Sequence, residues 1–219
     1  MDKDRIVRFS LAERIAHWVH AASFFTLLLT GLMVMSHKFL FLSVMVGGIQ
    51  NARIIHKLAG IVFALGTVLI FVLGDHKAFG RWLKDITTWG KVDLDFLKEF
   101  PKEFLGGHAN LPEQGRFNSG EKVNSLFILT GGAVLMTTGL MMWFADAMPL
   151  VIVRWAYPVH NLTALLMAAV VIAHMYLGLL HPGSKEAING MLRGTVTRAF
   201  AKSHHAKWYR EVTGEENAE

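Results

Sequence analysis

The sequence contains no cysteine at any of its 219 positions. That absence excludes disulfides, zinc sites built on thiolates, iron–sulfur ligation by this chain and the cysteine motif that attaches c-type haem. Charged residues are also few, at 18% of the chain, whereas hydrophobic residues make up 53%. Without cysteine, any metal must be held by histidine, carboxylate or methionine. With this composition, the chain is too apolar for an ordinary soluble domain.

Continuous apolar runs give four segments of the length that a membrane-spanning helix needs. They cover residues 15–36, 54–74, 123–145 and 153–180. The hydrophobicity is continuous rather than alternating, which argues against strands of a barrel. The predicted fold class is therefore an all-α integral membrane protein, a four-transmembrane-helix bundle that forms a single domain over residues 1–219. We expect the first segment to be retained, because it shows no convincing cleavage site.

Lysine and arginine fall mostly on one side of these segments. Four lie before or at the start of the first, eight between the second and third, and six after the fourth, which leaves four for the opposite side. The positive-inside rule then places both termini, the 75–122 loop and the 181–219 tail in the cytoplasm. The net charge of +5 follows from this topology. No base-reading motif accompanies it, so we expect no nucleic-acid partner.

The two cytoplasmic stretches outside the spans have the spacing of amphipathic helices. In the 75–122 loop, Pro101 predicts an interruption or restart of the helix. After the fourth span, Ser184 is expected to cap a helix that begins near Lys185. In the 75–122 loop, helices packed on the membrane face are favoured over a ligand site. After the fourth span, docking on the membrane surface or on a partner is favoured.

Four of the histidines within or at the start of the apolar segments are the main candidates: His17, His56, His160 and His174. A polar group at membrane depth costs free energy unless it finds a partner, so these residues are functional candidates. Fourteen residues separate His160 from His174. In a helix this interval rises about 21 Å and returns to within about 40° of the same face. One helix thus offers ligands at two depths of a hydrocarbon core roughly 30 Å thick.

The predicted topology pairs these histidines by depth, His17 with His174 near the cytoplasm and His56 with His160 near the outer face. Two stacked pairs of neutral imidazoles suit b-type haem, because the flat macrocycle takes one axial ligand on each side. An interhelical hydrogen bond or an interfacial position would explain one such histidine but not four matched in depth. His20, one turn after His17, could reach a haem propionate or face a neighbouring helix.

At these residues the chain resembles the cytochrome b (gamma) subunit of respiratory, membrane-bound formate dehydrogenases of the formate dehydrogenase-N type. The matching pieces cover nearly the whole chain, in order and at similar spacing. They are residues 13–18 (Glu-Arg-Ile-Ala-His-Trp), 53–56 with Gly60, 116–122, His160, 174–176, 183–184 and 204–211 (His-His-Ala-Lys-Trp-Tyr-Arg-Glu). The ordered set, with its C-terminal signature, is far more specific than four histidines alone.

The resemblance implies two haem b groups, with His17 and His174 as axial iron ligands of the cytoplasm-side haem and His56 and His160 as those of the periplasm-side haem. It also implies a quinone, menaquinone or ubiquinone, beside the cytoplasm-side haem, contacted by Asn118 and His174. An amide can hydrogen-bond a quinone carbonyl in either redox state. Without the resemblance, Asn118 would be interpreted as a helix cap or turn residue.

The same resemblance implies a place in the bacterial cytoplasmic (inner) membrane. The partners would be an iron–sulfur (beta) subunit and a molybdenum or tungsten catalytic (alpha) subunit, in a complex open to higher-order oligomers. Electrons from periplasmic formate oxidation would pass inward through both haems to the quinone and contribute to a proton motive force by a redox loop. The chain itself would not oxidise formate.

Two alternatives stay open. The first is the cytochrome b subunit of a membrane-bound hydrogenase or related oxidoreductase, which would share four helices and two bis-histidine haems. The second is a histidine-based metal transporter, which would want carboxylates along its pathway, where the spans hold almost none. One departure from the family pattern concerns the outer haem: Pro158 precedes His160 and predicts that the fourth helix begins late or bends there.

Overall fold

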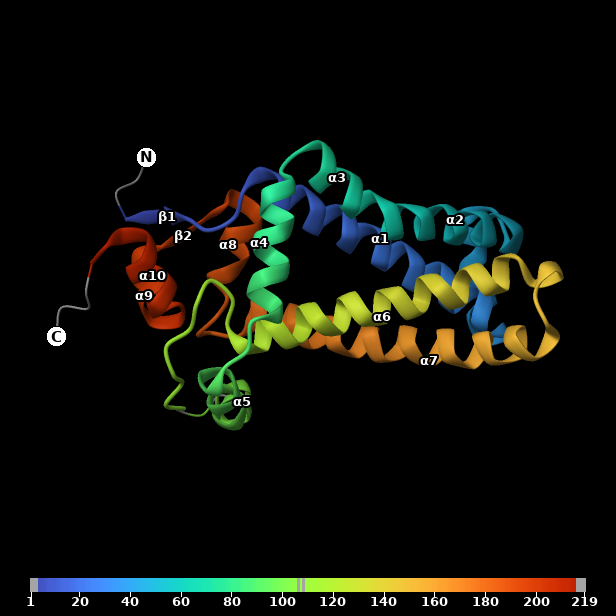
Figure 1. Cartoon of the computed structure of the whole chain (residues 1–219). Coiled ribbons are helices and arrows are strands. Elements are labelled where there is room, and N and C mark those ends of the chain that lie inside the picture. The colour runs from blue at the N-terminus through green and yellow to red at the C-terminus, as the bar shows by residue number, and fades with distance from the viewer. Residues whose placement is uncertain (1–3, 106, 108, 216–219) are drawn as a thin grey trace. The chain divides into compact units, whose positions relative to one another are not determined.

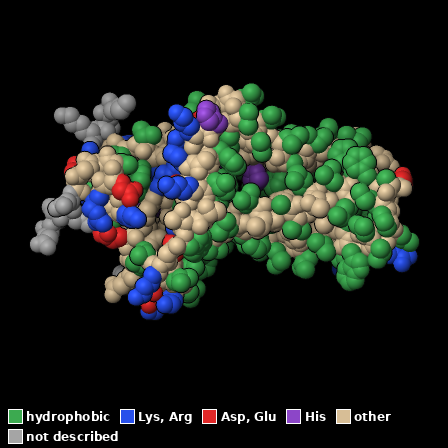
Figure 2. All heavy atoms as spheres, viewed as in Figure 1, with side chains coloured by type: hydrophobic (Ala, Val, Ile, Leu, Met, Phe, Trp, Pro, Cys, Tyr) green, Lys and Arg blue, Asp and Glu red, His purple; other side chains and the backbone are tan. Residues whose placement is uncertain are grey.

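The computed structural model describes residues 4–105, 107 and 109–215, so residues 1–3 and the last four of the predicted tail lie outside it. Four helical stretches are long and apolar enough to cross a membrane, Leu11–Met35, Ile49–Leu73, Ser119–Trp143 and Leu150–Leu180. They confirm the predicted four-helix membrane fold (Figure 1). Large hydrophobic side chains are exposed along all four, and Figure 2 shows them covering the helices. Such an apolar surface is suited to contact with lipid.

Two of the four spans contain a π-helical turn. The four spans and the turns that connect them within each pair consist of the following elements. They are α1 (Leu11–Met35), a 3₁₀ helix (His37–Val46), α2 (Ile49–Ile61), a π-helical turn (Val62–Gly66), α3 (Thr67–Leu73), α6 (Ser119–Trp143), a 3₁₀ turn (Ala145–Ala147), α7 (Leu150–Met175) and a second π-helical turn (Tyr176–Leu180).

The fourth span begins before Pro158, so the predicted late start is wrong. Helix α7 starts at Leu150 and runs through Pro158 to Met175. Its first turn forms on Pro149, whose carbonyl accepts hydrogen bonds from the N–H groups of Ile152 at 2.9 Å and Val153 at 3.3 Å. The helix is therefore established before the proline, which removes only one later N–H and is tolerated in membrane helices.

The chain divides into two compact units, which are described separately. The bundle unit comprises Ile15–His76 and Ile128–Val171, and the loop unit comprises Met1–Arg14, Lys77–Phe127 and Ile172–Glu219.

In the bundle unit a Cβ atom at Gly131 would lie 2.9 Å from the sulfur of Met167, a fully buried residue. Glycine at that position therefore lets α6 pack closely on α7 without displacing the Met167 side chain.

The loop unit contains short helices and one small sheet. The helices are α4 (His76–Thr87), α5 (Lys91–Phe104), α8 (Ala187–Arg193), α9 (Arg198–His204) and α10 (Ala206–Thr213). Strands β1 (Arg5–Val7) and β2 (Thr195–Thr197) pair antiparallel, with Ile6 opposite Val196 (Figure 1). A hydrophobic core forms where β2, α9 and α10 pack together. Its buried residues are Val196, Phe200, Ala201, Trp208 and Tyr209.

Two local predictions in the loop unit are wrong. Helix α5 continues through Pro101 to Phe104. The Phe100 and Phe104 rings, one on each side of the proline in the sequence, pack with centroids 6.1 Å apart and keep the apolar face of the helix together. Ser184 does not cap a helix, because its hydroxyl donates to the Leu177 carbonyl at 2.7 Å and α8 begins only at Ala187.

Candidate functional site

Two of the four predicted histidines meet inside the bundle unit. His56 on α2 and His160 on α7 have ring centroids 6.3 Å apart, and their ring planes are inclined by 62°. Each Nδ1 lies 2.9 Å from a threonine hydroxyl, that of Thr30 for His56 and that of Thr138 for His160. After its place in the predicted topology, we call this pair the outer histidine pair.

The hydrogen bonds of the two threonines determine which nitrogen of each ring is protonated. Thr30 donates its single hydroxyl proton to the Thr26 carbonyl at 2.6 Å, and Thr138 donates to the Val134 carbonyl at 2.7 Å. A hydroxyl has one proton, so each must accept a hydrogen bond from the imidazole. Both rings therefore carry their proton on Nδ1, which leaves the lone pair of Nε2 for a metal.

A glycine lies beside each of these rings. A Cβ atom at Gly31 would be 3.3 Å from Cε1 of His56, and one at Gly139 would be 3.5 Å from Cε1 of His160. The bare backbone lets each imidazole lie close to the neighbouring helix. The two half-sites thus have the same parts: a histidine, a threonine behind it and a glycine at its edge.

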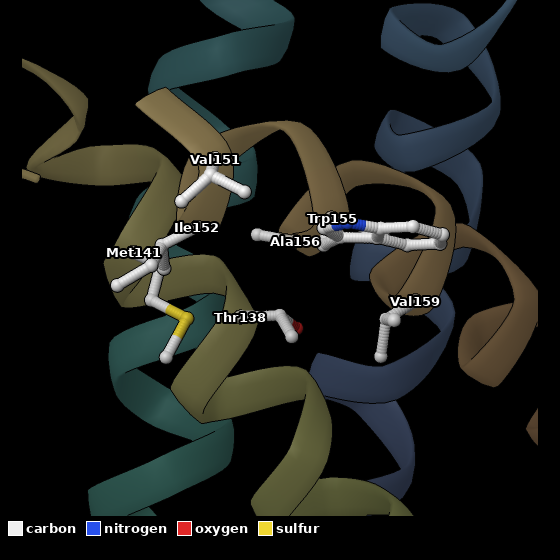
Figure 3. A pocket seen from close by; sticks show the side chains of 7 residues that line it. All are labelled: Thr138, Met141, Val151, Ile152, Trp155, Ala156 and Val159. Atoms are coloured by element: carbon white, nitrogen blue, oxygen red, sulfur yellow. The ribbon is translucent and has the colours of Figure 1, made fainter. Parts of the chain in front are cut away.

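A pocket of about 320 Å³ lies between α6 and α7, close to the His160 half-site (Figure 3). Six of its seven lining residues are apolar: Met141, Val151, Ile152, Trp155, Ala156 and Val159. The seventh is Thr138, whose hydroxyl is already bonded to the Val134 carbonyl and to His160. The pocket therefore adds no polar group to the chemistry of the outer pair.

The other membrane histidines are placed less directly. His17 lies on α1 in the bundle unit, with its ring edge-on to Trp18 at 5.0 Å between centroids. His174 lies in the last turn of α7, in the loop unit, so the pairing of His17 with His174 stays a prediction. His20 faces the second span, with its ring centroid 4.2 Å from that of Phe63.

Asn118 caps α6, as the interpretation without the family had it. Its Oδ1 accepts from the Glu121 N–H at 2.9 Å, and its own N–H donates to Glu121 Oε2 at 2.9 Å. These reciprocal bonds form a capping box, which satisfies two backbone donors at the helix start. Asn118 is therefore held rigidly at the first turn of the third span, within the loop unit.

Reciprocal ion pairs join the start of α6 to the start of α1. Arg8, whose side chain is 1% exposed, pairs with Glu121 at 2.8 Å and donates to the Arg116 carbonyl at 2.7 Å. Arg116 in turn pairs with Glu13 at 2.7 Å. Glu13 forms a capping box with Ser10, like that of Asn118 and Glu121. Sequence reasoning missed this Arg–Glu cross, although the pattern Arg-Phe-(Ser/Asn)-x-x-Glu occurs at both 8–13 and 116–121.

The C-terminal signature packs against the segment that precedes Asn118. The Nδ1–H of His205 donates to the Gly115 carbonyl at 2.8 Å, and Arg210 forms an ion pair with Glu113. Burial, and then the nearby positive charge of Arg8, lower the pKa of His205 to about 3. His205 is thus a neutral structural donor, and the signature supports the turn that carries Asn118.

A second polar cluster lies at the same helix start. Asp93 accepts from Lys122 Nζ and from the Ser119 hydroxyl, both at 2.7 Å. Burial raises the pKa of Asp93, but these hydrogen bonds and one from the Gly90 N–H outweigh it and hold the pKa below its ordinary value. Asp93 is therefore an ionised anchor for the first turn of α6.

The apolar four-helix fold and the paired imidazoles define a class of membrane cytochrome. The family model of the prokaryotic cytochrome b561 proteins matches residues 8–194, and the chain belongs to that family. Membership implies a b-type haem.

The individual relatives are more specific. The chain is 33% identical over 223 aligned residues to the formate dehydrogenase cytochrome b556(fdo) subunit of Escherichia coli K12, and the match covers 99% of both chains. It is 29% identical over 210 residues to the nitrate-inducible formate dehydrogenase cytochrome b556(Fdn) subunit of the same organism, covering 94% of this chain and 91% of the relative. A formate dehydrogenase cytochrome b556 subunit of Haemophilus influenzae is also 29% identical. The predicted resemblance is confirmed.

The outer histidine pair fits a b-type haem by its chemistry and by its spacing. Each Nδ1 is engaged by a threonine, so Nε2 is the nitrogen of each ring that would ligate iron. A metal–imidazole bond of about 2 Å on each side, with about 1 Å more to each ring centre, separates two ligand centroids by about 6 Å. The observed separation is 6.3 Å. Each half-site comes from a different pair of helices, so His56 and His160 would hold the haem from two sides of the bundle unit.

Proposed function

We propose that the chain is the dihaem cytochrome b subunit of a membrane-bound formate dehydrogenase, which carries electrons from a periplasmic iron–sulfur subunit to a quinone near the cytoplasmic face. The observation that carries the proposal is the outer histidine pair, with both Nδ1 protons held by threonines. The printed names of the relatives, formate dehydrogenase cytochrome b556 subunits, support the choice of complex. Bound haem would supply one-electron redox chemistry, and the chain supplies its ligands and their orientation.

The second haem is proposed on His17 and His174. Helix α7 carries both His160 and His174 without a break in its α-helical course. Their separation of fourteen positions therefore corresponds to a rise of about 21 Å. This spacing supports two ligand sets at different depths, one near each face of the membrane.

Asn118 is proposed as the quinone contact, together with His174. The cap already uses its Oδ1. A quinone carbonyl would therefore accept its hydrogen bond from the amide nitrogen, Nδ2. The capping box, and the ion pair of Arg8 with Glu121, fix the direction in which that amide points.

The partners and the orientation follow from the same proposal. The chain would assemble with an iron–sulfur (beta) subunit and a molybdenum or tungsten catalytic (alpha) subunit in the bacterial inner membrane. Both termini would be cytoplasmic, which agrees with the distribution of lysine and arginine. Formate oxidation outside and quinone reduction with protons from inside would then separate charge without a proton pump.

The electron donor is the test of the complex. The chain, purified with its partners, is exposed to formate or to hydrogen while the haem absorbance is followed. We expect reduction with formate. Reduction by hydrogen and not by formate would assign the chain to the hydrogenase alternative.

Two substitutions separate the cap from the quinone contact. Asn118→Ser keeps a side-chain oxygen for the cap, whereas Asn118→Ala removes it and should cost about 1 kcal/mol of stability. Neither variant keeps the amide donor, so both should lower the rate of quinone reduction by formate while haem reduction persists. An unchanged quinone rate in Asn118→Ser would remove Asn118 from the quinone site.

A further inference from the structure

Residues 8–31 and 116–139 carry an internal repeat without a gap. Arg-Phe-Ser at 8–10 returns as Arg-Phe-Asn at 116–118, Glu13 returns as Glu121, and Thr30-Gly31 returns as Thr138-Gly139. The offset is 108 residues in every case, as between Arg8 and Arg116. Each copy therefore begins at a capping box and reaches its Thr-Gly pair after the same number of residues.

The two copies make the same contacts in the bundle unit. Thr30 on α1 bonds His56 on the following span, and Thr138 on α6 bonds His160 on the following span, both at 2.9 Å. Each hydroxyl also donates to the carbonyl four residues earlier, and the two threonines are 3% and 7% exposed. One pair of helices thus builds one half-site, and the repeat builds the other.

We infer that Thr30 and Thr138 are equivalent positioning residues of the outer haem site, each fixing the tautomer and ring direction of one iron ligand. This inference rests on the proposed function, because it takes His56 and His160 as the ligands. Beyond the Thr-Gly pair the copies differ in length, because His56 follows its threonine by 26 residues and His160 follows its threonine by 22. His17 has no equivalent histidine in the second copy, since the position 108 residues after it is Ser125. The outer site is built from two equivalent halves, and the proposed inner site is not.

The helix geometry explains why threonine suits this role. A threonine in a helix donates readily to the carbonyl one turn back, which leaves its oxygen as an acceptor. The carbonyl thereby orients the oxygen, and the oxygen orients the Nδ1–H. A hydrogen bond at this position makes the imidazole a stronger ligand, and loss of such a partner typically weakens metal binding about 10- to 100-fold.

The predicted change is a shift in redox midpoint. A stronger imidazole donor favours ferric over ferrous haem, so loss of the hydrogen bond should raise the midpoint potential of the outer haem. A tenfold preferential weakening of the ferric form corresponds to about 59 mV for one electron.

The experiment compares Thr30→Val and Thr138→Val in the purified complex by redox titration and haem content. Valine keeps the shape and removes the hydrogen bond. The controls are Thr137→Val and Thr137→Ala, at an exposed position of α6. We expect upward shifts of similar size in Thr30→Val and Thr138→Val, and none in the controls.

Serine variants keep the inference testable if a valine variant fails to assemble. Thr30→Ser and Thr138→Ser retain the hydroxyl and should keep the wild-type midpoint, whereas Thr30→Ala and Thr138→Ala should shift it. Equal midpoints in the serine, alanine and wild-type proteins would overturn the positioning role. Retention of both haems in His56→Ala and His160→Ala would instead overturn the ligand assignment of the proposed function, so the two failures are distinguishable.

Discussion

The bundle unit and the loop unit hold their functional groups by different means. In the bundle unit, each imidazole of the outer pair is held by one neutral hydroxyl that is bonded back to its own helix. In the loop unit, Asn118 is held by a capping box and by ion pairs between segments far apart in the chain. A unit surrounded by lipid must satisfy polar groups within itself, whereas the loop unit can use charge.

The largest expected effect removes one half-site of the bundle unit. His56→Ala or His160→Ala deletes one axial ligand, so each variant should lose the outer haem. Without the outer haem, formate should no longer reduce the inner haem. Haem content by the pyridine haemochrome assay and formate-dependent absorbance measure this. His76→Ala, at the exposed start of α4, is the matched control and should retain wild-type haem. Unchanged haem content in either ligand variant would contradict the assignment.

The next effect concerns the ion pairs of the loop unit. Arg8→Ala leaves the carboxylate of Glu121 without its buried partner and should lower the free energy of unfolding by about 3 kcal/mol. Lys98→Ala breaks an exposed pair with Asp95, in which the lysine side chain is 73% exposed, and should cost at most about 1 kcal/mol. Unfolding in detergent measures both. Equal losses would mean that the Arg–Glu cross is no more important than a surface pair.

The loop unit should also respond to pH through His205. Its pKa falls from 6.5 to about 3 on folding. Between these two pH values, His205 is therefore protonated in the unfolded chain and neutral in the folded protein. Stability should therefore decrease as pH falls from 6.5 toward 3, by up to about 1.4 kcal/mol per pH unit from this group, and be independent of it above 6.5. His205→Asn keeps an N–H donor without the titration and should flatten the slope. An unaltered slope would contradict burial of a neutral His205.

The smallest effect tests how similar the two half-sites are. Alanine at Gly139 places a Cβ atom at an ordinary 3.5 Å from the His160 ring, whereas at Gly31 the distance to the His56 ring is a tighter 3.3 Å. Gly139→Ala should leave the electron paramagnetic resonance spectrum of the ferric outer haem near wild type, and Gly31→Ala should shift it slightly. The reverse order would mean that the glycines do not set the ring positions.

The sequence predicts the bundle unit better than the loop unit, for a physical reason. Apolar runs and membrane histidines stand out against their surroundings, so the four spans could be recognised without a structure. The prediction that the fourth helix begins late, at Pro158, was wrong. The first turn of the helix forms earlier, on Pro149, and the presence of Pro158 in the sequence gives no information about that turn. The pairing of β1 with β2 joins residues about 190 apart, which local patterns do not encode.

Some residues of the candidate site could be predicted from the sequence and others could not. The pairing of histidines by membrane depth and the family resemblance predicted His56 and His160, but not the threonines behind them. Thr30 and Thr138 look like ordinary helix residues until the 108-residue repeat is noticed. The cap role of Asn118 could be anticipated from its type and position, whereas the Arg–Glu cross that supports it depends on contacts between distant segments.

The number of haems bound by the purified chain tests the central claim most directly. A pyridine haemochrome assay, normalised to protein by amino-acid analysis, should give two b-type haems per chain. If the wild-type chain binds one haem, and both His56→Ala and His160→Ala lose it, only the outer site exists. That result would contradict the proposed pair of His17 with His174. No haem at all would contradict the account as a whole and return the metal transporter to consideration.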